Sequence, residues 1–116
     1  MKKIIFLVSG NGGTLKFLFH AINRLKLDFE ITGVIADRDC QALDFAEKHN
    51  ILYKKIKYNK DNPSELQFVL EGLNPDLIIT NIHKIIDAVT IKRYPGQFIN
   101  LHYSLLPGFS GLIGME

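Results

Sequence analysis

The sequence predicts an α/β fold, with a mostly parallel sheet of five strands and helices on both faces, in one domain over residues 1–116. Three observations lead to this prediction. Short apolar runs alternate with segments whose apolar residues recur at helical spacing, which is the pattern of successive βαβ units. The first apolar run is continuous, as in a strand covered on both faces. Glycines join that run directly to the first helical pattern.

The first half of the chain predicts two strand–helix pairs. Residues 4–8 form the first strand, and a helix follows from Thr14. Phe17 lies off the apolar stripe of that helix and widens it. Residues 31–36 form the second strand, and Asp39 is the expected N-cap of a short helix. The apolar stripe of the first helix comprises Leu15, Leu18, Phe19, Ile22 and Leu25.

The second half repeats the alternation. Residues 51–56 form a third strand that lysines interrupt, and Asn62 caps a helix with Glu65 at its third position. The later elements are a strand at 77–80, a helix at 87–94 and a strand at 98–101. Right-handed βαβ connections make such a sheet parallel and Rossmann-like, and ligands then bind beyond the carboxyl ends of its strands.

Composition limits the function classes. The chain has 14 basic and 12 acidic residues, a net charge of +2, which is no footprint for nucleic acid. A local basic run is interpreted as a solvated strand end; it comprises Lys54, Lys55, Lys57 and Lys60. No apolar run reaches the roughly 18 residues that a membrane span needs. The single cysteine, Cys40, makes no internal disulfide and suits a cytoplasmic protein.

A glycine loop, Ser-Gly-Asn-Gly-Gly-Thr at residues 9–14, joins the first strand to the first helix. Glycine lets a ligand approach backbone N–H groups, and the helix N-terminus adds unpaired donors. A phosphate site and a tight turn without a ligand are both open interpretations. The loop is no dinucleotide fingerprint, because Leu15 stands where a third glycine belongs, and no P-loop lysine follows.

Asp37 and Asp39 follow the second strand, where an acid often holds a ribose hydroxyl. We favour a structural role for this pair. Three stretches therefore end at one edge of the expected sheet and should converge there: residues 9–14, 36–40 and 100–111.

Asn100 and His102 project from one face at the end of the last strand, because residues two apart in a strand share a face. An amide stabilises oxygen charge in a tetrahedral intermediate, and an imidazole donates or accepts a proton. Ser104 is expected to fix the turn that follows. The alternative is that His102 is a polar strand-end residue.

The string Asn-x-His-x-Ser-Leu-Leu-Pro at residues 100–107 resembles the signature of the folate-dependent formyltransferases. The glycine loop and Asn-Pro-Asp at residues 74–76 are similar to the branch that acts on glycinamide ribonucleotide in purine synthesis. The resemblance covers residues 3–111.

The resemblance implies a role for each matched position. Asn100 and His102 would be catalytic, acting on the formyl group of 10-formyltetrahydrofolate as cosubstrate. The phosphate of the small-molecule substrate would bind Gly12, Gly13 and Thr14. The folate pocket would be lined, partly through backbone groups, by Ile82, His83, Lys84, Ile85 and Ile86. No metal is implied.

The chain departs from the family pattern at several positions. Gly13 and Thr14 replace a polar pair, His83 and Lys84 replace Met-Arg, and residues 112–116 lack the branch's histidines. The family's third catalytic residue is an aspartate beyond residue 116, so we expect an N-terminal nucleotide- or phosphate-binding domain without its C-terminal part. The alternatives are an inactive phosphate-binding module and a formyltransferase for a nucleotide-linked amino sugar or a charged tRNA.

Overall fold

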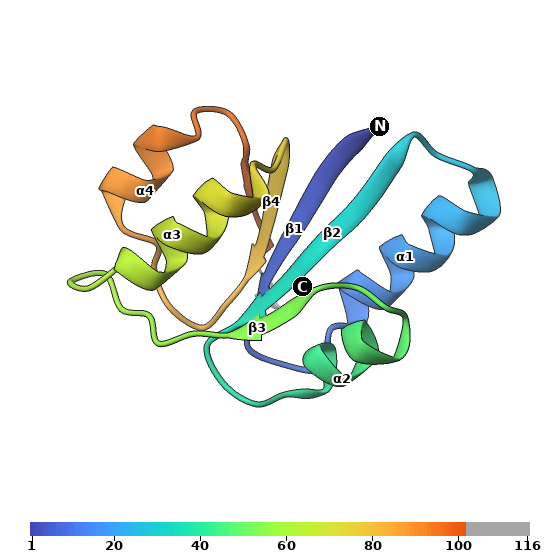
Figure 1. The fold of residues 1–116 in the computed structure, drawn as a ribbon, viewed down its shortest axis with the longest axis horizontal. Coiled ribbons are helices and arrows are strands. Elements are labelled where there is room, and N and C mark those ends of the chain that lie inside the picture. The colour runs from blue at the N-terminus through green and yellow to red at the C-terminus, as the bar shows by residue number, and fades with distance from the viewer. Residues whose placement is uncertain (102–116) are drawn as a thin grey trace, which may run out of the picture.

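A computed structural model describes residues 1–101, as a five-stranded sheet with four helices (Figure 1). The strand order is β3-β2-β1-β4-β5, and every neighbouring pair is parallel, so the predicted fold class is confirmed. The strands are β1 (Lys2–Val8), β2 (Phe29–Ala36), β3 (Tyr53–Lys55), β4 (Leu77–Asn81) and β5 (Phe98–Asn100). The helices are α1 (Gly13–Leu25), α2 (Gln41–Lys48), α3 (Ser64–Leu73) and α4 (Ala88–Arg93).

Strand β1 is buried on both faces, as its continuous apolar run predicts. Ile4, Phe6 and Val8 pack in one cluster with residues of α1 and α2, whereas Ile5 and Leu7 pack in a second cluster with residues of α3. Successive side chains of a strand point to opposite faces, so one strand serves two cores. Each large apolar side chain buried in this way stabilises the fold by roughly 1.5–3 kcal/mol. Figure 1 shows α1 and α2 on one side of the sheet and α3 and α4 on the other.

The apolar stripe of α1 is narrower than predicted. Leu15 is fully buried, but Phe17 is 74% exposed and Leu25 is 65% exposed. Phe17 lies two residues after Leu15, which places it on nearly the opposite side of a helix with 3.6 residues per turn. Leu25 is the last helical residue, and the chain turns away at Lys26 through a left-handed conformation with φ 54°.

The two predicted helix caps were wrong. Helix α2 is preceded by Cys40, and the carboxylate of Asp39 instead lies 3.3 Å from the ammonium of Lys55. Helix α3 starts at Ser64 after Pro63, so Glu65 is its second residue. The side chain of Asn62 accepts a hydrogen bond from the Ser64 hydroxyl rather than from a helix amide. In both places another side-chain contact replaces the capping bond, with Lys55 for Asp39 and with Ser64 for Asn62.

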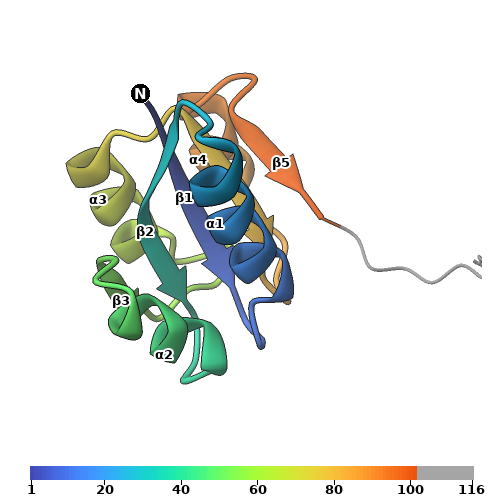
Figure 2. The ribbon, with the colours of Figure 1, turned by 90° about the vertical axis from the view of Figure 1, so that its right-hand side faces the viewer.

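The sheet ends in two short strands. β3 covers three residues, whereas six were predicted. The apolar residues Ile51 and Ile56, which suggested the longer strand, are buried but lie outside it. All three β3 residues are exposed, and lysines on an exposed edge oppose pairing with another chain. β5 lies at the other edge, as Figure 2 shows.

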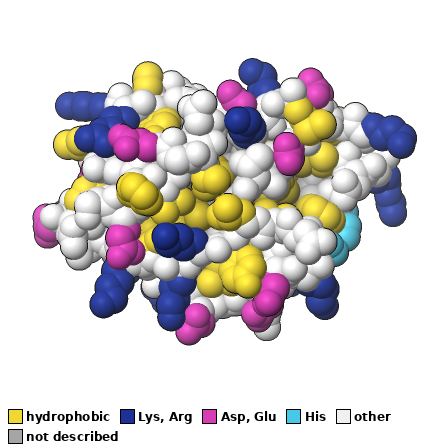
Figure 3. Space-filling view, in the orientation of Figure 1, with side chains coloured by type: hydrophobic (Ala, Val, Ile, Leu, Met, Phe, Trp, Pro, Cys, Tyr) yellow, Lys and Arg dark blue, Asp and Glu magenta, His cyan; other side chains and the backbone are white. Residues whose placement is uncertain are grey.

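Basic and acidic side chains are interspersed over the face in Figure 3, and no single-sign field appears there. Within residues 1–101, none of the helices has the length and apolar character needed to cross a bilayer.

Candidate active site

The strand order reverses at β1, whose neighbours are β2 on one side and β4 on the other. In open parallel sheets the ligand crevice lies beyond the carboxyl ends at such a reversal. The chain segments that leave β1, β2 and β4 meet there. The Ser9 hydroxyl donates to Asp37 Oδ1 over 2.7 Å and accepts from the backbone N–H of His83 over 2.9 Å. The predicted convergence is confirmed for residues 9–14 and 36–40.

A cavity of about 580 Å³ opens beside this meeting point. It contains all five residues predicted to line the folate pocket, together with Asn100. Gly12, Gly13 and Thr14 are not among its lining residues. The full lining is Thr80, Asn81, Ile82, His83, Lys84, Ile85, Ile86, Ile91, Phe98, Asn100 and Leu101.

The glycine loop leads into α1 through Gly12, which has φ 77°. This left-handed conformation costs an L-residue energy and is free for glycine. A Cβ atom at Gly12 would also lie 2.9 Å from the Cβ of Ala42 in α2. Gly12 is therefore needed for the fold itself. This observation supports the tight-turn interpretation and leaves the phosphate interpretation open beside it.

Asn11 provides a side-chain contact that the sequence analysis did not single out. Its Oδ1 accepts a hydrogen bond of 3.1 Å from the backbone N–H of Gly13, the first residue of α1. An acceptor at a helix N-terminus satisfies one of the unpaired donors there. One backbone amide of the loop, that of Gly13, therefore donates to an oxygen atom.

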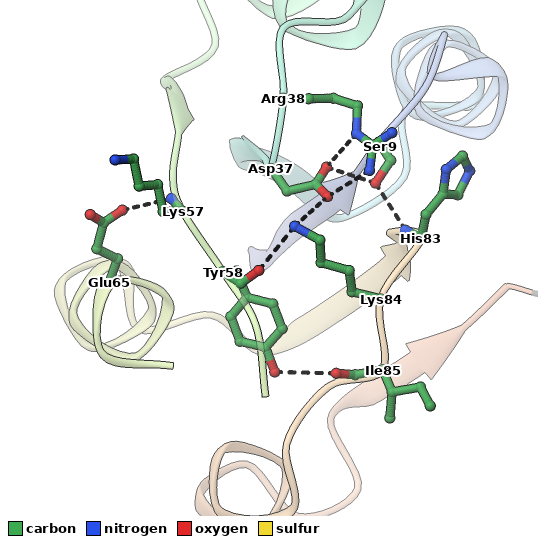
Figure 4. A network of polar contacts seen from close by, with 9 residues as sticks. All are labelled: Ser9, Asp37, Arg38, Lys57, Tyr58, Glu65, His83, Lys84 and Ile85. Carbon is green, nitrogen blue, oxygen red and sulfur yellow. Dashed lines mark hydrogen bonds and ion pairs between the residues drawn. The ribbon is translucent and has the colours of Figure 1, made fainter. Parts of the chain in front are cut away.

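Four contacts hold the segment 82–86 in place (Figure 4). The His83 amide donates to Ser9, as given above. The Lys84 ammonium lies 3.2 Å from Asp37 Oδ2 and donates to the carbonyl of Tyr58 over 3.0 Å. The Tyr58 hydroxyl lies 3.4 Å from the carbonyl oxygen of Ile85. The wall of the cavity is consequently tied to β1, β2 and the segment after β3.

Asp37 is the most heavily contacted acid of the site. Its side chain has no exposed surface. Burial acts to raise its pKa, but hydrogen bonds from Arg38, Ser9 and Lys84 outweigh burial and lower that pKa from 3.8 to about 2. The carboxylate is therefore ionised at neutral pH, and its two oxygen atoms are engaged by protein groups. These contacts support the structural role favoured for Asp37.

A second buried network closes the far end of the segment. Tyr58, 3% exposed, accepts from the Asp87 amide over 2.7 Å and donates to Asp87 Oδ1 over 2.9 Å. The carboxylate of Asp87 also accepts from the backbone N–H of Thr90 and caps α4. Burial raises the pKa of Tyr58 to about 12, which keeps its phenol neutral. Although burial acts to raise the pKa of Asp87, the bonds from Thr90 and Tyr58 lower it.

Asn100 ends β5 and pairs in register with Thr80 of β4. It lies at the same edge of the sheet as Gly12, as predicted, because both follow the carboxyl ends of parallel strands. His102 and Ser104, the other predicted members of this segment, lie outside the described residues.

Sequence reasoning missed Asn11, Tyr58 and Asp87 as site residues. The position of Asn11, a polar residue just before α1, could have indicated its contact with the helix N-terminus. Nothing in the sequence near Tyr58 indicated its contact with Asp87, because the two residues are 29 positions apart. Within residues 1–101, no group of three histidine, cysteine or acidic residues is arranged to hold a metal ion.

Comparisons with known proteins point to one family. The family described as formyl transferase matches residues 2–116. Phosphoribosylglycinamide formyltransferase of Haemophilus influenzae is 31% identical over 97% of this chain and 56% of its own length. Formyltetrahydrofolate deformylase 1 of Arabidopsis thaliana is 29% identical over 94% of this chain and 35% of its own length.

A solved structure of phosphoribosylglycinamide formyltransferase from Coxiella burnetii superimposes with a TM-score of 0.81 at 31% identity, over 96% of this chain and 56% of that one. The chain spans about half the length of the phosphoribosylglycinamide formyltransferases it matches. The family match extends over nearly all of the sequence, and the fold superposition agrees with it. The chain belongs to the formyl transferase family.

Proposed function

We propose that this chain belongs to an enzyme that transfers a formyl group from 10-formyltetrahydrofolate to the amine of glycinamide ribonucleotide. The chain would supply the phosphate-binding part of the glycine loop, residues 12–14, and the folate segment, residues 82–86. One observation carries the proposal. The segment 82–86 and Asn100 line one cavity, and Ser9 ties that segment to the start of the glycine loop. A formyl donor and a phosphorylated acceptor bound at these places would have neighbouring sites.

In this proposal the acceptor phosphate binds Gly12, Gly13 and Thr14. Backbone donors at the N-terminus of a 13-residue helix and the helix dipole both favour an anion. The Asn11 side chain would leave the Gly13 amide when a phosphate oxygen arrives. The ribose and the amine would then extend from the loop toward the cavity.

The cosubstrate would occupy the cavity beside residues 82–86. Its volume, about 580 Å³, is within the range of roughly 300–1,000 Å³ for small-molecule sites. Ile82, Ile85 and Ile86 offer apolar surface to an aromatic ring system, and the backbone of the segment offers donors and acceptors to ring nitrogen atoms. His83, from the same segment, also lines the cavity.

The chemistry we propose is acyl transfer. The amine nitrogen of the acceptor attacks the formyl carbon, and the bond from that carbon to the folate nitrogen then breaks. Asn100 donates a hydrogen bond to the oxygen atom as its charge develops. His102 transfers the proton that the amine loses to the departing nitrogen. Ser104 fixes the turn after these two residues.

Residues 1–116 form, in this proposal, the N-terminal phosphate-binding domain of the enzyme, working in the cytoplasm. The relatives also favour a second candidate, because formyltetrahydrofolate deformylases are among them at 24–29% identity. Hydrolysis would use the same cavity and Asn100, with water in place of the amine. It would need no acceptor at the glycine loop.

Titration of the 116-residue chain by two-dimensional NMR tests the assignment. Glycinamide ribonucleotide at millimolar concentration should shift the amides of Gly12, Gly13 and Thr14, and inorganic phosphate should shift them more weakly. The corresponding riboside, which lacks only the phosphate, is the matched control and should leave them unmoved. If the amide shifts of Gly12, Gly13 and Thr14 do not change with the ribonucleotide, but those of residues 82–86 change with a folate, the result would favour deformylation over formyl transfer.

A further inference from the structure

The carboxylate of Asp37 is a junction between three segments that are distant in sequence. Ser9, at the start of the glycine loop, donates to its Oδ1, and Lys84, in the folate segment, lies at its Oδ2. Arg38 donates to both oxygen atoms, at 3.2 and 3.0 Å. These contacts satisfy a carboxylate that has no exposed surface.

The contacts of Ser9 and Lys84 extend the junction further. Ser9 donates to Asp37 and simultaneously accepts from the His83 amide, so its hydroxyl orientation is fixed by the carboxylate. Lys84 also donates to the Tyr58 carbonyl, and the neighbouring Lys57 amide is fixed by the Glu65 side chain over 2.8 Å. The ammonium therefore joins β2, the segment after β3 and the cavity wall.

Figure 4 shows Lys84 and His83 leaving the segment on opposite sides. The ammonium of Lys84 extends toward Asp37 and Tyr58. Its charge is therefore engaged by protein groups, and the residue is also among those that line the cavity.

We propose that Asp37 is a positioning residue, whose carboxylate fixes the glycine loop and the folate segment relative to one another through Ser9 and Lys84. The proposal rests on the function proposed above only in naming the ligands, glycinamide ribonucleotide at the glycine loop and a folate at residues 82–86. Lys84 lines the cavity, and its side chain takes part in this junction. The charge is permanent at neutral pH, because the pKa of Asp37 lies at about 2.

Amide hydrogen exchange of the unliganded chain tests the junction without any turnover. Asp37→Asn preserves the shape of the side chain and removes the charge that holds Lys84. Exchange at the His83 amide, the donor to Ser9, should accelerate at least tenfold, and exchange in the centre of β1 should change less than twofold. Asp39→Asn is the matched control. It removes the same charge only two residues from Asp37, but the side chain of Asp39 is 87% exposed. It should leave His83 unaffected.

Lys84→Met keeps Asp37 paired with Arg38 and serves if Asp37→Asn fails to fold. It should also accelerate exchange at His83, and Lys84→Arg should restore protection because it retains the cation. Glycinamide ribonucleotide affinity should fall in Lys84→Met although Lys84 lies outside the glycine loop. Protection of His83 equal to wild type in both Asp37→Asn and Lys84→Met would overturn the junction. If both variants lose protection at His83 but the wild type binds no ribonucleotide, the junction stands and the proposed function is refuted.

Discussion

Gly12→Ala is the substitution whose cost the structure specifies most closely. The residue has φ 77°, and an L-residue in the left-handed region costs roughly 1–2 kcal/mol. The added Cβ would lie 2.9 Å from the Cβ of Ala42 and 3.3 Å from its Cα, so α1 and α2 must move apart. Overpacking of this kind costs typically about 1–3 kcal/mol.

The two terms together predict a loss of about 2–5 kcal/mol in the free energy of unfolding. That is a large part of the roughly 5–15 kcal/mol of a typical domain. Urea denaturation, with comparison of midpoints at equal m-value, measures the loss. Gly10→Ala and Gly13→Ala are the controls. A Cβ at Gly10 meets nothing within 4 Å, and one at Gly13 meets only Asn11 Oδ1 at 3.8 Å.

Both control variants should unfold within about 1 kcal/mol of wild type, since each lacks the contact with α2 and φ is positive only at Gly12 in this loop. A Gly12→Ala chain that is as stable as Gly10→Ala would refute the packing argument. The glycine would then be retained for ligand approach alone.

Three further predictions concern the buried networks and Asn100. Tyr58→Phe should lose about 1–3 kcal/mol of stability, because it leaves the Asp87 amide without its partner, whereas Tyr53→Phe on the exposed strand should change little; thermal unfolding distinguishes them, and equal melting would contradict the network. Asp37 alone should contribute a fall of about 2 kcal/mol in the free energy of unfolding between pH 4 and pH 2, because the unfolded chain protonates it near pH 3.8 and the folded chain near pH 2. Asp37→Asn should remove that part of the pH dependence. In a full-length enzyme carrying this site, Asn100→Ala should lower turnover by roughly a hundredfold with little change in substrate affinity, and unchanged steady-state turnover would remove Asn100 from the proposed mechanism.

Much of the fold could be predicted from local sequence patterns. The continuous apolar run of β1 indicated a strand buried on both faces, and Ile5 and Phe6 do lie in different cores. The glycines before Leu15 indicated a loop at the start of α1. These features depend on periodicity and backbone freedom, which neighbouring residues determine.

Helix ends were less predictable for a physical reason. Asp39 and Asn62 have the chemistry of capping residues, but each finds another partner within reach: Lys55 for Asp39 and Ser64 for Asn62. Capping competes with other side-chain contacts of similar energy, whether local as for Asn62 or tertiary as for Asp39, and residue type alone does not decide which one forms.

The sequence by itself determined that a glycine loop, an acid after β2 and Asn100 would lie at one edge of a parallel sheet, because parallel strands send all their carboxyl ends to that edge. Only the tertiary structure decided what their side chains do there. Asp37 and Lys84 are 47 positions apart, and their contact follows from the placement of β2 and β4 on either side of β1. Burial then gives that contact its strength, since a carboxylate without exposed surface must be satisfied by protein groups instead of water.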